Sequence, residues 1–358
     1  MSKKTIWVIA IVLIALIMSF AIPKMTQPVS NEPEQTVEEV RDTIAYWNED
    51  SAVMASIIDY VNSVTDETSE NFVSEEDRIA VFDFDGTLYG ELFPTYFDTW
   101  IFVHRALHDE TCTPSEEIRK YAEEMEKAFL NHLPEPESDL STAQCTAELF
   151  KDMSYENYRK YIQDFMKENT VGFDNMTFAE GFYLPMVALV QYLDEKDFTV
   201  FISSGSERTM VRELIDGVLD EAIPSHQIIG STFSFKATNQ GSKNPKSYTF
   251  TKEDDVLMEG NLVIKNQKTN KVFSIINEIG KTPVLVFGNS SGDLAMGEYT
   301  VDHGGKGYML LCDDLERDYG SLETAEKFKK DCEKIGLETV SMKNDFKTIY
   351  KEDSSKSE

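Results

Sequence analysis

Two aspartates separated by one residue follow a short apolar segment in the first third of the chain. Residues 78–82 read RIAVF, and the next five read DFDGT, beginning at Asp83. The apolar run is typical of a buried β-strand, and the glycine favours a turn after it. On a segment that turns at Gly86, Asp83 can present a carboxylate as a nucleophile, and Asp85 can act beside it as an acid or base.

Two more polar clusters follow predicted strands further along the chain. An apolar run at 198–202 precedes Ser203-Ser204-Gly205-Ser206, after which we expect a helix over 207–219. Another apolar run at 283–287 precedes the sequence GNSSGD, residues 288–293. Because the carboxyl ends of parallel strands meet at one edge of a sheet, we expect the three clusters to converge there.

Strands that alternate with helices predict an α/β fold with a parallel sheet and right-handed crossovers. Residues 90–185 carry no strong strand signal, and their helical periodicity predicts a helical insertion, with helices over 95–108, 115–131, 141–151 and 155–168. The remaining expectations are two short helices within 36–64 interrupted at 48–50, hairpin strands at 248–250 and 262–264, a helix over 271–279, and a fourth core strand at 308–311.

The DFDGT segment closely resembles the signature of the haloacid dehalogenase superfamily, and the resemblance extends over residues 79–299. It implies a Rossmann-like parallel-sheet core with an α-helical cap inserted after the first motif strand, as in the phosphoserine-phosphatase-like branch. It also implies Asp83 as the nucleophile, Asp85 as the general acid and base, Ser203 in FISSGSE as a phosphate-binding hydroxyl, and Lys271 as the neutralising cation.

The last motif of the family is matched by GNSSGD, with a departure. Asn289 stands where an aspartate is usual, which leaves Asp293 as the only carboxylate of the loop. The resemblance implies a Mg²⁺ ion held by oxygen ligands from Asp83, Asp85, Asn289 and Asp293, and the lost charge puts its affinity in question.

The phosphoryl oxygens are expected to meet backbone amides near Ser204 and Gly205 at a helix start. Phosphoserine phosphatases place a glutamate shortly after the first motif, where it meets the polar end of the substrate. Glu91 lies one residue before that position and is a weaker candidate for substrate binding.

Together these residues predict a Mg²⁺-dependent phosphatase that hydrolyses a small phosphomonoester through an aspartyl-phosphate intermediate. Asp85 favours phosphate chemistry over dehalogenation, because a halide leaves without a proton. One alternative is a phosphotransferase or mutase of the same superfamily. The other, suggested by Asn289, is a catalytically weak surface-binding protein that retains the fold.

Each candidate residue also has a plainer explanation. The aspartates can be solvated turn residues, Ser203 can cap a helix, and Lys271 can be a solvated lysine like its neighbours Lys265, Lys268 and Lys281. His104 and His108 have the spacing of metal ligands on a helix, but Arg105 occupies the place of the glutamate in zinc proteases, which favours surface histidines. The aromatic residues expected to pack the cap on the core are Tyr89, Phe93, Tyr96, Phe97 and Trp100, with the lining of a substrate pocket as the alternative for some of them.

The charge of the chain restricts its partners. The 358 residues include 34 Lys and Arg against 64 Asp and Glu, a net charge of −30, and 41% of them are apolar. Such a chain can form a globular core, but it repels phosphate backbones, which excludes a broad nucleic-acid-binding surface.

The four cysteines, an even number, permit two disulfides without requiring them. The oligomeric state stays open.

The N-terminal segment predicts export. Lys3 and Lys4 precede an apolar run over 5–22, so residues 1–22 are either a cleaved signal peptide or a retained membrane anchor. The protein is then secreted or held on the extracellular face, and it meets the membrane only through an uncleaved segment. The expected organisation is a flexible linker at 23–40, an α/β core at 41–89 and 186–350, a helical cap at 90–185, and a charged tail at 351–358.

Overall fold

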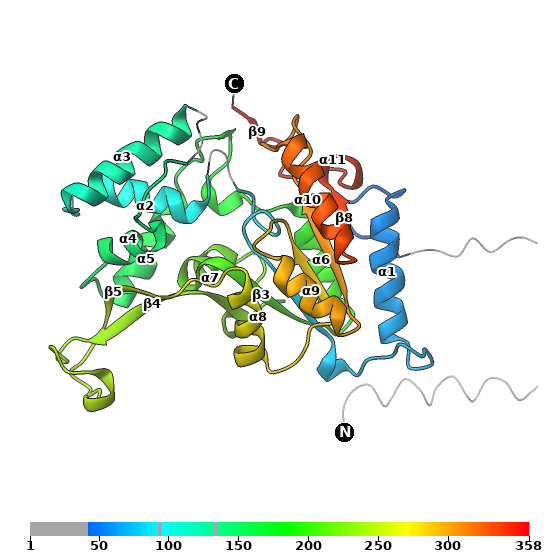
Figure 1. The fold of residues 1–358 in the computed structure, drawn as a ribbon, viewed down its shortest axis with the longest axis horizontal. Coiled ribbons are helices and arrows are strands. Elements are labelled where there is room, and N and C mark those ends of the chain that lie inside the picture. Colours follow the sequence, from blue (N-terminus) through cyan, green and yellow to red (C-terminus); the bar gives the residue numbers. More distant parts are fainter. Residues whose placement is uncertain (1–41, 92–94, 132, 134, 358) are drawn as a thin grey trace, which may run out of the picture. The chain divides into compact units, whose positions relative to one another are not determined.

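A seven-stranded sheet organises the computed structural model, which describes residues 42–91, 95–131, 133 and 135–357 (Figure 1). The strand order is β5-β4-β3-β1-β6-β7-β8, and every neighbouring pair is parallel except β4 and β5. The predicted α/β fold with a parallel core sheet is therefore confirmed. The strands are β1 (Ile79–Phe82), β3 (Thr199–Glu207), β4 (Ile228–Ala237), β5 (Val256–Ile264), β6 (Leu285–Gly288), β7 (Lys306–Leu311) and β8 (Glu338–Ser341).

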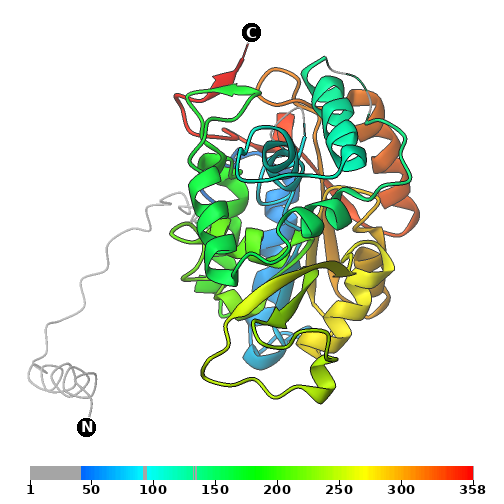
Figure 2. The ribbon, with the colours of Figure 1, turned by 90° about the vertical axis from the view of Figure 1, so that its left-hand side faces the viewer.

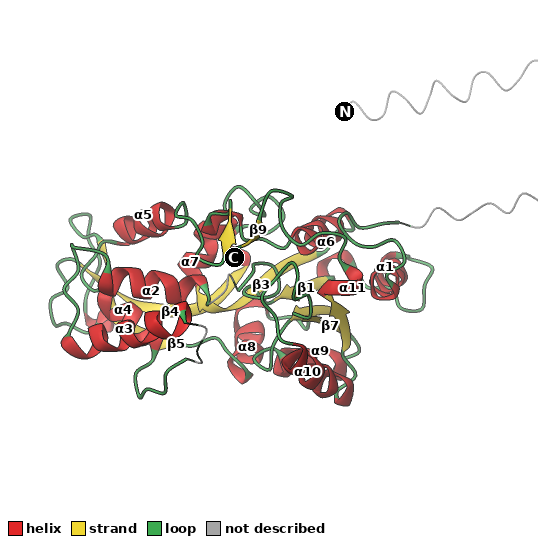
Figure 3. Ribbon diagram, turned by 90° about the horizontal axis from the view of Figure 1, so that it is seen from above, coloured by secondary structure: helices red, strands yellow, loops and turns green. Residues whose placement is uncertain are grey.

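Helices cover both faces of the sheet (Figure 3). Alternate residues of β1 show why: Ala80 and Phe82 belong to one apolar cluster, whereas Ile79 and Val81 belong to a second. A central parallel strand buried on both faces has to be apolar throughout, as this one is. One face carries α6 (Leu184–Glu195) and α7 (Arg208–Ile215), and the other carries α8 (Thr269–Ser274), a π-helical turn (Ile275–Ile279), α9 (Leu294–Asp302) and α10 (Leu322–Lys334).

A helical segment lies between β1 and β3, as expected for an insertion after the first motif. It contains α2 (Phe97–Leu107), α3 (Glu116–Leu130), α4 (Thr142–Leu149) and α5 (Tyr155–Phe165), close to the four predicted ranges. The β4–β5 hairpin extends from the core sheet to join these helices (Figure 1). The Gln144 amide of α4 donates to the Gly260 carbonyl at 3.1 Å and accepts from the Leu262 amide at 2.8 Å. The hairpin is thus part of the packing of the insertion.

Two local expectations are wrong. Residues 42–50 form turns and a bridge rather than the end of a helix, because the Trp47 indole donates to the Pro185 carbonyl and its ring packs on Phe346. Within the described part of the predicted range, residues 42–64, the helix is α1 (Ala52–Thr65). Residues 248–250 do not form a strand, because Asp254 folds this loop on itself by accepting from the Tyr248 hydroxyl at 2.8 Å. The partner of β5 is β4 instead.

The last part of the chain returns to the body. Within 351–358, β9 (Ser355–Lys356) pairs antiparallel with β2 (Phe173–Asp174), close to the C terminus (Figure 2). A short helix, α11 (Met342–Asp345), precedes it. Four 3₁₀ turns complete the described elements: Glu75–Asp77, Phe178–Glu180, Ser225–Gln227 and Pro245–Ser247.

The predicted signal peptide or anchor and the linker, residues 1–40, lie outside the described residues. Among the helices that are described, none has the length and apolar character needed to cross a bilayer. All four cysteines are free, so neither of the two permitted disulfides is formed.

Candidate active site

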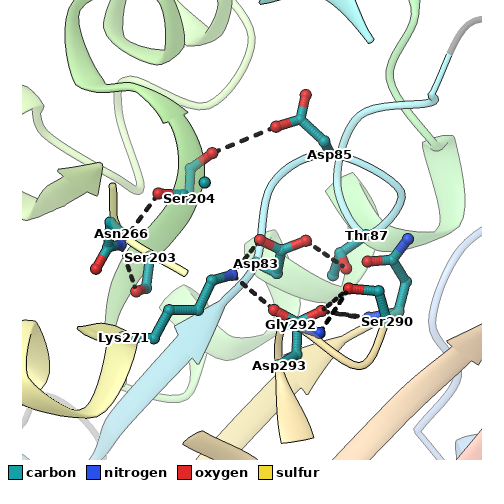
Figure 4. A network of polar contacts seen from close by, with 12 residues as sticks. Asp83, Asp85, Thr87, Ser203, Ser204, Asn266, Lys271, Ser290, Gly292 and Asp293 are labelled. Atoms are coloured by element: carbon teal, nitrogen blue, oxygen red, sulfur yellow. Dashed lines mark hydrogen bonds and ion pairs between the residues drawn. The ribbon is translucent and has the colours of Figure 1, made fainter. Parts of the chain in front are cut away.

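The loop after β1 is a tight turn that places its two aspartates in different surroundings (Figure 4). The Asp83 amide donates to the Phe287 carbonyl at 2.8 Å, which extends the pairing of β1 with β6 by one residue. Gly86 then adopts a left-handed conformation, with φ of 77°, which glycine accepts without strain. The Asp83 side chain consequently lies at the sheet edge, while Asp85 faces the end of β3.

Lys271 joins two of the predicted clusters. Its ammonium is buried and donates to the Asp83 carboxylate and, at 2.6 Å, to Asp293 Oδ1. Burial opposes the charge of this lysine, but the two carboxylates outweigh burial and raise its pKa. By contrast, Lys281 pairs with Asp77 at the surface. A cation fixed beside Asp83 is suited to neutralise charge that develops on a bound anion.

Asp83 has unusual electrostatics for a carboxyl. Its burial raises its pKa to about 7, the charge of Asp293 adds to this effect, and Lys271 opposes it. Its second oxygen, Oδ2, has a weak hydrogen bond of 3.4 Å from the Thr87 hydroxyl. One carboxylate oxygen is therefore held by the lysine, and the other keeps capacity for a further partner.

Asp85 lies against the serine-rich end of β3. Its Oδ2 accepts from the Ser206 hydroxyl at 2.7 Å and from the Ser204 hydroxyl at 3.3 Å. Burial raises the pKa of Asp85 to about 7, so the carboxyl exchanges its proton near neutral pH. A group with such a pKa serves both as a proton donor and as a proton acceptor at physiological pH.

The serine cluster differs from the expectation in its backbone. Strand β3 continues to Glu207, and α7 begins at Arg208 with Glu207 as its N-cap, its carboxylate accepting from the Thr209 amide at 2.9 Å. Neither a capping role for Ser203 nor a helix start at Ser204 and Gly205 is therefore correct. The serines lie in the last part of β3, at the carboxyl edge of the sheet, because the strand continues beyond its apolar run to Glu207.

Asn266 is a buried site residue that the sequence pattern did not single out. Its amide nitrogen donates to the Ser203 hydroxyl at 3.1 Å and to the Ser204 carbonyl at 3.0 Å. Its carbonyl oxygen is buried without a hydrogen-bond partner. The only signal was its position five residues before Lys271, in a polar segment. Asn266 fixes the Ser203 hydroxyl as an acceptor and leaves its proton free to donate.

The last motif folds around Asp293. Its Oδ2 accepts from the amides of Asn289 and Ser290, at 3.1 and 3.0 Å, and from the Ser290 hydroxyl at 3.1 Å. Since Oδ1 is held by Lys271, both oxygens of Asp293 are occupied. The geometry thus makes Asp293 an organiser of the loop and a partner of the lysine.

Glu91 lies next to Asn289. The Asn289 amide nitrogen donates to Glu91 Oε1 at 3.0 Å, and the Tyr96 hydroxyl donates to the same oxygen at 3.2 Å. Burial raises the pKa of Glu91 to about 7. Glu91 therefore contacts the last motif, a position that its place in the sequence did not predict.

The site is hollow. A cavity of about 120 Å³ is bounded by Asp83, Asp85, Gly205, Ser206, Lys271 and Asn289, whereas Ser203 lies beneath its surface. A second cavity of about 480 Å³ shares Tyr96, Asn289 and Ser290 with the first and continues along Leu310 and Phe328. A small polar space therefore adjoins a larger and more apolar one.

The remaining candidates lie elsewhere or have other partners. His104 is hydrogen-bonded to the Tyr161 hydroxyl at 2.8 Å and His108 to Glu126 at 2.6 Å, so the two histidines do not share a ligand position. Lys265 and Tyr96 line the small cavity. The other predicted packing aromatics are buried where the structure describes them, namely Tyr89, Phe97 and Trp100, and Phe93 lies outside the described residues.

The donor set suits a hard cation. Asp83 Oδ2, the carbonyl oxygen of Asn289 and the backbone carbonyl of Asp85 are the oxygen ligands that Mg²⁺ prefers. In the described part of the chain, no three His, Cys, Asp or Glu side chains are grouped as a metal site. The oxygen donors named here include one side-chain carboxylate, that of Asp83.

Comparison with known proteins gives a family. The sequence profile of the haloacid dehalogenase-like hydrolases matches residues 80–298, which is more than half of the chain and spans all three motif loops. No curated protein matches the chain in sequence.

Comparison with solved structures finds matches that are distant in sequence. A functionally unknown protein from Anaerococcus prevotii is 14% identical, with 83% of this chain and 94% of that chain covered and a TM-score of 0.49. Cytosolic 5′-nucleotidase IIIB bound to cytidine is 11% identical (84% and 88% covered, TM-score 0.45). A probable phosphoserine phosphatase from Vibrio cholerae is 12% identical (70% and 58% covered, TM-score 0.37).

Proposed function

The chain belongs to the haloacid dehalogenase-like hydrolase family, and from this premise we propose that it is a Mg²⁺-dependent phosphatase acting on a small phosphomonoester. The observation that carries the proposal is the burial of Lys271 between Asp83 and Asp293. A lysine brought to this position from 188 residues along the chain has a costly desolvation to offset. The buried position of Lys271 is explained by an anionic intermediate that forms on Asp83 and then reacts further.

The ion is held, in this proposal, by Asp83, the Asp85 backbone carbonyl and Asn289. When bound, Mg²⁺ reduces the repulsion between the Asp83 carboxylate and a phosphate dianion. In this proposal Asp293 is not assigned as a ligand, because its Oδ2 accepts three hydrogen bonds from the loop and its Oδ1 accepts from Lys271, whereas Asp83 Oδ2 accepts one weak bond, from Thr87. This assignment differs from the ligand set expected from the family pattern.

The chain's residues then act in two steps. An Asp83 oxygen attacks phosphorus, the bond from phosphorus to the ester oxygen breaks, and the departing oxygen takes the proton of Asp85. Asp85 next accepts a proton from a water molecule that attacks the aspartyl-phosphate, which releases inorganic phosphate and restores Asp83. A carboxyl with a pKa of about 7 is suited to both proton transfers.

The phosphoryl group is held by polar groups at the end of β3. Ser206 and Gly205 line the small cavity, and Ser203 supports it from beneath through its bond to Asn266. Lys271 balances the negative charge of the phosphoryl oxygens during transfer. The leaving group extends from this space toward the larger cavity beyond Asn289, whose apolar side favours a partly apolar alcohol.

Export is part of the proposal and rests on the N-terminal segment alone. The basic residues and the apolar run of 1–22 support export, with the protein either secreted or anchored on the extracellular face of the membrane. Fractionation of expressing cells, with mass determination of the mature N terminus, distinguishes a cleaved signal peptide from an anchor.

The test is phosphate release from p-nitrophenyl phosphate by the full-length chain in mild detergent, with and without Mg²⁺. We expect metal-dependent turnover that is lost in Asp83→Asn and kept in Asp77→Asn, which changes an exposed aspartate in the same way. Adding alcohols or sugars as acceptors tests phosphoryl transfer. A folded wild-type chain that neither turns over nor forms a beryllofluoride adduct contradicts the proposal and favours a binding protein.

A further inference from the structure

The last motif of this chain lacks one negative charge, and no other residue of its loop supplies a carboxylate in its place. Asn289 is neutral, and Asp293 uses both oxygens for Lys271 and the loop amides. The metal ligands assigned above therefore contain one side-chain carboxylate, Asp83, and its charge is already shared with Lys271. A divalent cation in such a place needs negative charge from another element.

Glu91 is the carboxylate that the fold brings to this point. It follows the first motif by a few residues, yet its Oε1 accepts from the Asn289 amide nitrogen at 3.0 Å. The approach depends on Gly86: a Cβ atom there would lie 1.8 Å from Asn289 Nδ2 and 2.8 Å from Glu91 Oε1. The turn thus leaves room for the Glu91–Asn289 pair directly above the nucleophile loop.

The hydrogen bond also fixes which atom of Asn289 faces away from Glu91. An amide that donates its nitrogen to a carboxylate turns its carbonyl oxygen to the opposite side, where it can serve as a metal ligand. A carboxylate that orients a ligand in this manner is a common arrangement behind metal sites and raises the affinity of the ligand for the ion.

We propose that Glu91, acting through Asn289, supplies the negative charge that the last motif lacks, so that the Glu91–Asn289 pair replaces the usual aspartate of the Mg²⁺ site. Glu91 is then a positioning residue for the metal and not a contact for the polar end of the substrate. This inference rests on the proposed function for its metal, and its test measures metal binding apart from turnover.

The experiment is isothermal titration of the full-length chain with Mg²⁺ alone. For Glu91→Gln, which keeps the size of the side chain and removes its charge, we expect Mg²⁺ binding weaker by about 10- to 100-fold. The matched control is Glu298→Gln, the same change at an exposed residue of α9, which should bind Mg²⁺ like the wild type.

A second variant makes the test independent of whether Glu91→Gln folds well. Asn289→Asp restores the usual carboxylate, so we expect tighter Mg²⁺ binding than in the wild type. In that background Glu91→Gln should lose little or no affinity, because the introduced carboxylate no longer depends on Glu91 and the two acids repel each other.

Three results overturn the inference: unchanged Mg²⁺ affinity in Glu91→Gln, an equal loss of affinity in both backgrounds, or no Mg²⁺ binding by the wild type. Failure of the proposed function looks different. A wild-type chain that binds Mg²⁺ through Glu91 but turns over no phosphate ester leaves the inference standing and removes the phosphatase.

Discussion

Replacing Lys271 with methionine removes the cation between two buried carboxylates and keeps a side chain of similar length. Lys271 and Asp293 are 2% and 1% exposed, so water cannot replace the lost charge. Breaking a buried ion pair by removing one partner costs about 3–5 kcal/mol. The control is Lys281→Met, which breaks the exposed pair with Asp77 and should cost at most about 1 kcal/mol.

The loss should depend on pH with a definite sign. Burial raises the pKa of Asp83 to about 7 in the wild type, even though Lys271 lowers it, so the variant has a still higher pKa there. A carboxyl whose pKa is raised by folding stabilises the folded state at low pH, and this stabilisation is lost as the pH rises to the folded pKa. In the wild type the loss is complete near pH 7. In the variant, whose Asp83 pKa is higher, the free energy of unfolding continues to fall above pH 7. Between pH 7 and pH 8.5 this widens the difference in stability between the variant and the wild type by up to about 2 kcal/mol, at about 1.36 kcal/mol per pH unit.

Urea unfolding of both variants and the wild type at pH 6 and pH 8.5, followed by circular dichroism, measures these differences. The expected result is a loss for Lys271→Met of about 3–5 kcal/mol at pH 8.5 that is clearly smaller at pH 6. A loss as small as that of Lys281→Met, or one that does not change with pH, refutes the reasoning about the buried cation.

Three further predictions concern single side chains. Asp85→Asn should slow the first turnover, measured as release of the alcohol or phenol, by about 10²–10⁴-fold for an alkyl phosphate and much less for p-nitrophenyl phosphate, because p-nitrophenolate leaves without a proton; equal losses in this first step speak against a general acid. Asn266→Ala leaves the Ser203 hydroxyl and the Ser204 carbonyl without their donor, so unfolding should be easier by about 1–3 kcal/mol and inhibition by phosphate weaker, and unchanged values count against its supporting role. Burial raises the pKa of Asp318 to about 6, so its stabilising contribution falls as the pH rises from about 4.5 to 6; Asp318→Asn should flatten the stability profile by about 2 kcal/mol over that range, and a parallel profile contradicts it.

Four core strands, β1, β3, β6 and β7, and the helical insertion could be predicted from the sequence, because the strands contain continuous apolar runs and the helices have helical periodicity, whereas β8 was not predicted. The four residues of β1 are all apolar, as burial on both faces requires, and α2 to α5 have their apolar residues at helical spacing. Strand β4 was not predicted, because Gly230 and the adjacent polar residues Ser231 and Thr232 separate its apolar residues into short pieces.

The site was predictable in its residue types and less so in its contacts. The convergence of Asp83, Ser203 and Asp293 could be predicted because each follows an apolar run that forms a parallel strand, whereas Lys271, on α8, was predicted from the family resemblance. The roles of Asn266 and Glu91 could not be predicted, because each depends on a contact between segments more than 60 residues apart. The end of β3 was misplaced since serines continue the strand past its apolar run.

A covalent intermediate on Asp83 is central to the proposed function, and it is tested most directly by trapping it. The full-length Asp85→Asn variant is mixed with Mg²⁺ and p-nitrophenyl phosphate, quenched in acid, digested and analysed by mass spectrometry. We expect one phosphoryl group on the peptide that contains Asp83, labile to hydroxylamine, and none in Asp83→Asn. Phosphate turnover by Asp83→Asn, or phosphorylation of any other residue in its place, would contradict this mechanism.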